Sequence, residues 1–176
     1  MKGQLTIQYL ASFIFFIGLI VYIYFAYSIN LPAFVEEVRK EDIRSKAFQL
    51  SEILLNDPGD PSNWGPDMEH TDINRIGLSD ENSNKTNLIS LKKIDELKFI
   101  CSNVGFEFIQ KKLAFNKPFS IHVFNISQDS GERNLLIDCV SPDFPKTSIN
   151  ATVKRITALN NTDTGELEIA EIIVQM

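Results

Sequence analysis

Hydrophobic residues form one long block near the start of the chain and shorter, regularly spaced patterns elsewhere. Residues 5–29 are almost entirely apolar, and the strongly polar exceptions before Ser28 are Thr6, Gln8 and Ser12. At about 1.5 Å per residue, roughly 20 such residues span a hydrocarbon core of about 30 Å. The block is therefore long enough to cross a membrane as a helix.

The pattern changes after Pro32, because residues 33–56 mix apolar and charged positions. Glu36 and Lys40 form an i,i+4 pair in the favourable order, and Asp57-Pro58-Gly59 is a strong helix stop. We therefore expect one helix over residues 4–56, with an apolar first half and an amphipathic second half. The apolar residues expected to line one face of the second half are Phe34, Val38, Ile43, Ala47, Leu50 and Leu54.

Residues 57–90 are rich in Pro, Gly, Asn, Asp and Ser, which predicts turns and loops rather than packed elements. Trp64 and the triplet Ile76-Gly77-Leu78 are the apolar residues expected to attach this segment to the folded domain. The acidic stretch that starts at Asp80 has no Gly at its sixth position, and Leu91 stands where a calcium loop needs Glu. We expect no metal site and no cofactor.

Residues 91–176 predict helices first and strands afterwards. Apolar spacing indicates two short helices, around residues 91–97 and 104–113. Alternating patterns then predict strands in FSIHVFNI, NLLIDCV, SINATVKRITAL and ELEIAEIIVQ, with hairpin turn signals at residues 129–131 and 160–165. This order predicts an α+β head domain whose antiparallel sheet packs on the amphipathic half of the long helix.

The apolar block differs from a cleavable secretory signal. Such a signal has a shorter apolar core followed by small residues at the exit site, whereas Asn30-Leu31-Pro32-Ala33-Phe34 follows here. Lys2 precedes the block and, by the positive-inside tendency, favours a cytoplasmic N-terminus. We therefore expect the block to be retained in the mature protein.

The N-terminal sequence Lys2-Gly3-Gln4, continued by LTIQYL and a long half-apolar helix, resembles archaeal type IV pilins and pilin-like proteins with class III signal peptides. The family places a basic residue and Gly before the cut and Gln after it, often with Tyr at the sixth mature position, and Gly3, Gln4 and Tyr9 match. The resemblance implies that a prepilin peptidase removes residues 1–3 on the cytoplasmic side. It also implies that the helix first anchors the protein in the membrane and later packs in a filament core below an α+β head.

The resemblance further implies which residues and partners serve assembly. The family commonly has Glu where Gln8 stands, and that Glu is thought to neutralise the new N-terminal amine in the apolar bundle. Gln brings no charge, and an unpaired buried ammonium is costly, so this departure favours a minor subunit. The implied partners are self or other pilins, prepilin peptidase, the membrane assembly machinery, and membrane lipid before assembly. The implied assembly residues are Gln8, Tyr9, Phe13, Phe16 and Leu19.

Two cysteines, Cys101 and Cys139, are the only ones in the chain. If the head lies outside the membrane, a disulfide between them is the expected use of such a pair. The alternative is two buried free thiols, which behave as small apolar residues. The bridge is the favoured interpretation.

Four Asn-x-Ser/Thr sequons occur after the long helix and none lies within it, which fits a glycosylated cell-surface protein. Two of them lie in turn-rich stretches and are the better candidate acceptors, whereas the other two border predicted strands. The turn-rich pair is Asn84 and Asn160, and the strand-bordering pair is Asn125 and Asn150.

Composition and motifs argue against two other classes of function. The formal net charge of −6 disfavours nucleic-acid binding, which needs concentrated Lys and Arg. His70 and His122 are far apart in sequence, Asp138 has no neighbouring His in the chain, and no phosphate-binding or hydrolase motif occurs. We therefore expect a non-enzyme. Two hypotheses remain: a structural pilin-like subunit with a role such as adhesion, and an uncleaved, single-pass, membrane-anchored extracellular binding module.

Overall fold

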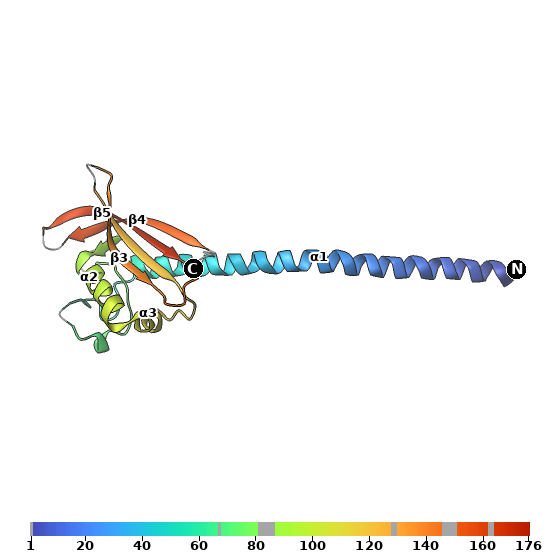
Figure 1. The fold of residues 1–176 in the computed structure, drawn as a ribbon, viewed down its shortest axis with the longest axis horizontal. Helices are drawn as coiled ribbons and strands as arrows, with labels where there is room; N and C mark the ends of the chain where they lie inside the picture. Colours follow the sequence, from blue (N-terminus) through green and yellow to red (C-terminus); the bar gives the residue numbers. More distant parts are fainter. Residues whose placement is uncertain (1, 67, 81–86, 128–129, 146–150, 162–163) are drawn as a thin grey trace. The chain divides into compact units, whose positions relative to one another are not determined.

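The protein is described here by a computed structural model of residues 2–66, 68–80, 87–127, 130–145, 151–161 and 164–176, with side chains from residue 7 onward. The chain divides into two compact units, residues 1–41 and 42–176. The first unit is helical, and the second contains the end of that helix and all strands (Figure 1).

The long helix α1 runs without interruption from Lys2 to Asn56, 55 residues that include Pro32. Its apolar residues meet two different environments. Ile43, Ala47 and Leu50 are buried, whereas Phe34 and Val38 are 64% and 52% exposed. Within this continuous helix, the expectation of one common apolar face from Phe34 to Leu54 is wrong. The step from Val38 to Ile43 is five residues, and at about 3.6 residues per turn such a step leads to a different face of the helix.

The head contains short helices on one side of a sheet (Figure 1). The α-helices α2 (Leu91–Phe99) and α3 (Phe106–Leu113) lie in the two predicted regions, and the π-helical turn η2 (Ile100–Val104) lies between them. The strands are β2 (Ser120–Ile126), β3 (Arg133–Val140), β4 (Thr152–Asn161) and β5 (Glu166–Gln175). Each matches one of the predicted strand segments. The α+β class predicted from the sequence is therefore confirmed.

The sheet has the order β1-β4-β5-β2-β3 and is mixed rather than wholly antiparallel. The four predicted strands pair antiparallel, but the short strand β1 (Leu88–Ser90) pairs parallel with residues 158–160 of β4. This strand lies at the end of the segment 57–90, for which the sequence predicts only turns and loops. Three residues are too few for a recognisable alternating pattern.

The described residues between α1 and β1 contribute to the core, although regular structure among them is limited to the short 3-10 helix η1 (His70–Asp72) and two isolated bridges. Trp64, Ile76 and Leu78 are buried, as the sequence suggests for these apolar residues. The indole Nε1 of Trp64 donates hydrogen bonds to the carbonyl oxygens of Pro58 and Gly77. A Cβ at Gly77 would lie 2.1 Å from the carbonyl oxygen of Asp57, so only glycine fits there.

A buried lysine joins this segment to α2. Lys93 is 3% exposed, and its Nζ donates to the carbonyl oxygens of Pro58, Ser62 and Ser79 at 2.6–2.8 Å. A buried ammonium is costly unless it is hydrogen-bonded, and three backbone carbonyls of the irregular segment bind this one. Lys93 therefore fixes the fold of the irregular segment from within the core.

The inner face of the sheet packs against the C-terminal part of α1 and against α2. The core includes Leu50 and Leu54 of α1, Ile94 of α2, and alternate residues of the strands such as Ile121 and Ile172. Arg155 of β4 also reaches α1, where its guanidinium pairs with Glu52 and lies 4.5 Å from the centre of the Phe48 ring. The outer face of the sheet keeps several exposed apolar side chains.

Candidate membrane and assembly helix

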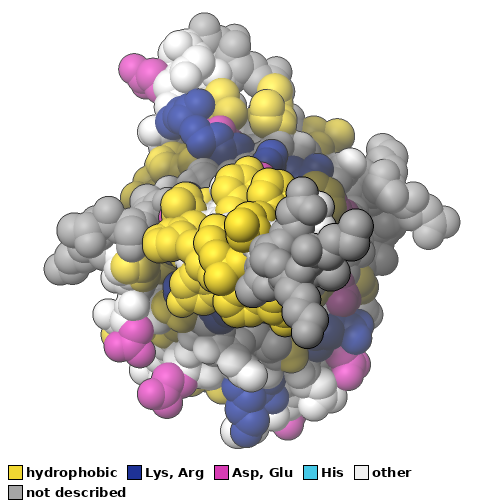
Figure 2. Space-filling view, turned by 90° about the vertical axis from the view of Figure 1, so that its right-hand side faces the viewer, with side chains coloured by type: hydrophobic (Ala, Val, Ile, Leu, Met, Phe, Trp, Pro, Cys, Tyr) yellow, Lys and Arg dark blue, Asp and Glu magenta, His cyan; other side chains and the backbone are white. Residues whose placement is uncertain are grey.

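The largest exposed apolar surface belongs to α1 before residue 39. Figure 2 views this helix from the end that is rightmost in Figure 1, and the side chains toward the viewer are mainly hydrophobic. In the described part of the chain, one helix is long and apolar enough to cross a membrane, judged by length and composition. Its most apolar window has no residue buried inside the protein. A surface of this kind needs lipid or another protein around it.

The residues that the resemblance assigns to assembly lie on this surface. Tyr9, Phe13 and Phe16 are 75%, 55% and 60% exposed, and Gln8 and Leu19 are also exposed. Lys2, Gly3 and Gln4, to which the resemblance assigns processing, have helical backbone, and nothing is described of their side chains. Every described assembly residue is thus available for contact with lipid or a partner.

The helix surface becomes charged toward the end of the first unit. Glu36 and Lys40 form the expected pair, with the Lys40 Nζ 2.9 Å from a Glu36 oxygen. The hydrogen bond and the charge of Lys40 lower the pKa of the Glu36 carboxyl. Both side chains are at least 60% exposed, so the pair contributes little to the stability of the helix.

Asp42 opens the second unit and binds two lysines. Its Oδ2 accepts hydrogen bonds from Lys46 at 2.8 Å and from Lys117, in the loop after α3, at 3.1 Å. The hydrogen bond from Lys46, and after it the one from Lys117, lowers the pKa of the Asp42 carboxyl. The hydrogen bond between Asp42 and Lys46 also raises the pKa of Lys46. Asp42 therefore connects the helix to the head where the helix surface starts to be covered.

The predicted disulfide is confirmed. Cys101 of η2 and Cys139 of β3 are bonded across a sequence separation of 38 residues. The bond attaches the helical layer to the last strand of the sheet order, and Cys139 itself is fully buried. The free-thiol alternative does not apply to this structure.

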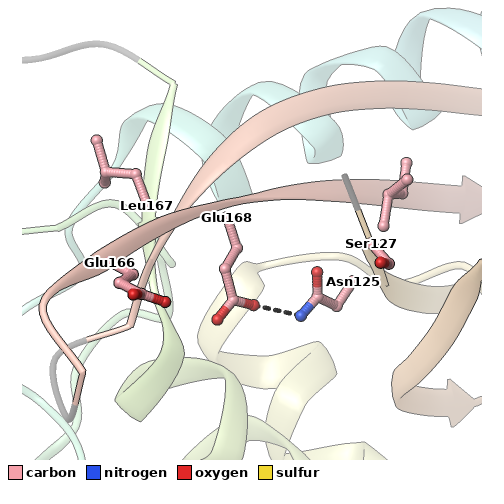
Figure 3. A pocket seen from close by; sticks show the side chains of 6 residues that line it. Asn125, Ser127, Glu166, Leu167 and Glu168 are labelled. Carbon is pink, nitrogen blue, oxygen red and sulfur yellow. Dashed lines mark hydrogen bonds between the residues drawn. The ribbon is translucent and has the colours of Figure 1, made fainter. Parts of the chain in front are cut away.

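The two sequon asparagines within the described residues, Asn125 and Asn160, are hydrogen-bonded to carboxylates. Asn125 Nδ2 donates to a carboxylate oxygen of Glu168 beside a shallow pocket (Figure 3). Asn160 Nδ2 donates to Asp80, which is 6% exposed. The nitrogen that a glycan would use is therefore engaged at both positions. Asn84 and Asn150 lie outside the described residues, and glycosylation of the chain stays a prediction.

The sheet brings together three polar residues that sequence reasoning treats as separate. His122 Nδ1 lies 3.1 Å from Asp138 Oδ1, and His122 Nε2 lies 3.0 Å from Ser120 Oγ. Asp138 does have a histidine beside it, because His122 on β2 pairs with Asp138 on β3. The available signal was that these two positions fall in adjacent strands of a predicted hairpin.

The Ser120, His122 and Asp138 contacts follow the order of a nucleophile, base and acid triad. However, Ser120 has no exposed surface, and its Oγ also lies 3.2 Å from Gln175 Oε1. A nucleophile must reach its substrate, so the geometry fits a polar network across the sheet better than a hydrolytic site. The expectation of a non-enzyme stays a prediction.

The other histidine lies against the helical layer. His70 Nδ1 is 3.1 Å from Glu96 Oε1 on α2, and the His70 ring is 5.5 Å from the Phe99 ring. The Glu96 side chain is 7% exposed. The contact attaches η1 to α2, and neither histidine forms a metal-type cluster with acidic or sulfur side chains within the described ranges.

Comparisons with protein-family models, with curated proteins and with solved structures find no match to this chain.

Proposed function

We propose that this chain is a minor structural subunit of an archaeal type IV pilus-like surface filament, cut before Gln4 and assembled through its apolar helix. The observation that carries the proposal is the sustained exposure of large apolar side chains along α1, from Ile7 to Val38. Each fully buried Leu, Ile or Phe contributes about 1.5–3 kcal/mol relative to water. Such a surface is therefore stable only in lipid or against neighbouring helices, and the exchange of lipid for helices depends on side-chain packing rather than on the hydrophobic effect.

The disulfide supports a location for the head. Disulfides persist in oxidising compartments and are rare where thiols are kept reduced. The Cys101–Cys139 bond therefore favours a head outside the cell, with the N-terminus in the cytoplasm, as Lys2 also suggests. In this arrangement α1 crosses the membrane once before assembly and occupies the filament interior afterwards.

The decisive test is the N-terminus of native protein from surface-sheared material. Mass spectrometry should find Gln4 as the first residue, with or without cyclisation. Gly3→Val should block the cut and retain the chain in the membrane fraction, since the resemblance implies a glycine before the cut. Thr6→Ser, placed beyond the cut, should leave both processing and release unchanged.

An intact Met1 in the native protein would support the second candidate, an uncleaved, membrane-anchored binding module. Gln8 favours this candidate, because a helix that keeps its leader has no new amine to neutralise inside an apolar bundle. The absence of the protein from sheared filaments would contradict the filament proposal even if the leader is removed.

A further inference from the structure

The strand β3 forms one edge of the sheet. It ends the strand order, and among the described residues no other strand pairs with its outer side. The side chains of Leu135 and Val140 on this strand are 51% and 42% exposed. Edge strands present unpaired N–H and C=O groups that can bind another extended chain, and many are protected by Lys or Pro. The eight residues of β3 include neither Lys nor Pro, and the strand has one register irregularity, at Leu136.

The charges on β3 complement a second copy of the same strand. Arg133 begins the strand and contacts Glu171 on the outer face of the sheet, and Asp138 contacts His122. Both side chains are more than half exposed, at 53% and 57%. The register of β3 against β2 shifts by one residue between these two positions, so Arg133 and Asp138 lie on the same face of the sheet although they are five residues apart. In an antiparallel pair with a register that aligns residue 133 with residue 138, each Arg133 lies opposite the Asp138 of the other copy. Opposite charges across a strand pair are favourable.

We propose that β3 is a self-association edge, on which two copies of this chain pair antiparallel and join their five-stranded sheets into one. The chain has a net charge of −6, so two copies repel over most of their surface. On β3, by contrast, Arg133 and Asp138 balance each other. Leu135 lies next to the two-fold axis of this register, and an apolar contact there excludes water from the new backbone hydrogen bonds.

The symmetry of this contact limits what it can build. An antiparallel pair of identical strands is a two-fold contact that closes on itself, whereas a helical filament repeats a head-to-tail contact. The β3 pair therefore joins two heads and does not propagate. In the proposed filament, the contact would connect subunits of different filaments, and this consequence rests on the proposed function. The dimer itself is independent of that proposal.

The test compares Leu135→Lys with Leu167→Lys in the full-length chain in detergent. Leu167 is a matched control because it is 54% exposed on β5, a strand with partners on both sides. Sedimentation equilibrium should show a dimer for the wild-type chain and for Leu167→Lys. The dissociation constant of Leu135→Lys should be at least about tenfold higher, because an edge lysine opposes strand pairing. Equal association of Leu135→Lys and wild type, equal weakening by both variants, or a monomeric wild type would overturn the proposal.

A charge exchange tests the register. Arg133→Asp and Asp138→Arg should each weaken the dimer, since each places like charges opposite one another. The double variant should recover most of the association, which a merely local loss of stability would not produce. Thermal unfolding of each variant checks that the head is folded, and a folded double variant that remains monomeric would contradict this register. All variants keep α1, so association through the helix does not change between them. Cleavage after Gly3, which tests the proposed function, is measured in a separate experiment.

Discussion

Two stretches of one helix contain similar residues and meet opposite environments. Before residue 39, the Phe, Ile and Leu side chains of α1 from residue 7 onward are exposed, whereas Leu50, Leu54 and Leu55 are almost completely buried. The hydrophobic driving force per residue is similar in both, so composition does not distinguish them. The head covers the apolar surface of the second stretch, whereas lipid or another chain must cover that of the first.

The largest effect should come from placing a charge in each stretch. Leu50→Asp buries a carboxylate in the head core and should lower the free energy of unfolding by about 5 kcal/mol or more. Phe16→Asp should leave that free energy unchanged and weaken membrane insertion, where Asp costs about 2.5–3.5 kcal/mol at a helix centre. Fluorescence of Trp64, the single tryptophan and 1% exposed, reports unfolding of the head, and membrane fractionation reports insertion.

These two readouts should separate completely. Leu50→Asp is expected to remain membrane-bound, because its apolar block is intact, while its head unfolds. A destabilised head in Phe16→Asp would mean that the first stretch belongs to the head core, which would contradict the comparison. Unchanged membrane fractionation of Phe16→Asp would contradict the prediction that Phe16 lies in the hydrocarbon core of the bilayer.

A smaller effect should follow from removal of the Cys101–Cys139 bond. The double variant with alanine at both positions should lose about 3–4 kcal/mol of head stability, since the bond closes a loop in the unfolded chain. Guanidinium titration monitored by Trp64 should show the loss under non-reducing conditions. Reductant should destabilise the wild type and leave the double variant unchanged. Equal midpoints for wild type and variant would mean that the bridge does not contribute to the stability of the head.

Much of the head could be predicted because its strands are long and their apolar residues alternate over part of their length. In FSIHVFNI, the apolar residues Phe119, Ile121 and Val123 are fully buried and His122 and Phe124 are not, although Ser120 is buried as well. The period of two in a strand makes this alternation readable without a structure. The disulfide could also be anticipated, since a bond is the expected use of two cysteines in a domain that is predicted to lie outside the membrane.

The features that the sequence did not predict depend on distant parts of the chain. β1 is three residues long, and its pairing depends on the distant strand β4 and on residues 78–80. The contact of His122 with Asp138 requires the register of β2 and β3, which has an irregularity between Val123 and Phe124. The five-residue step from Val38 to Ile43 indicates a change of helix face, but the apolar pattern alone does not mark this change because both residues are apolar. Whether an apolar face is covered depends on tertiary contacts, which spacing alone does not determine.

The smallest expected effect concerns Asp42, where the exposed stretch of α1 gives way to the covered one. Lys46 and Lys117 hold the pKa of Asp42 below its ordinary value of 3.8 in the folded head. The ionised carboxylate therefore stabilises the fold above that ordinary value, and this contribution is lost as the pH falls through the lowered folded pKa. Asp42→Asn should remove it and flatten the acid side of the stability profile. The effect should be slight and should decrease with added salt, because the side chain is 47% exposed.

Glu36→Gln provides the matched control for Asp42→Asn. Glu36 also has a lowered pKa and a lysine partner four residues away, but it lies in the exposed stretch before the head. Unfolding followed by Trp64 between about pH 7 and pH 2 should therefore change its acid limb in Asp42→Asn and remain unchanged in Glu36→Gln. An equal response of both variants would place the limit of the head before Glu36. The comparison between the two stretches would then need a different dividing point, because the helix surface around Glu36 and Lys40 would belong to the cooperative unit that contains Trp64.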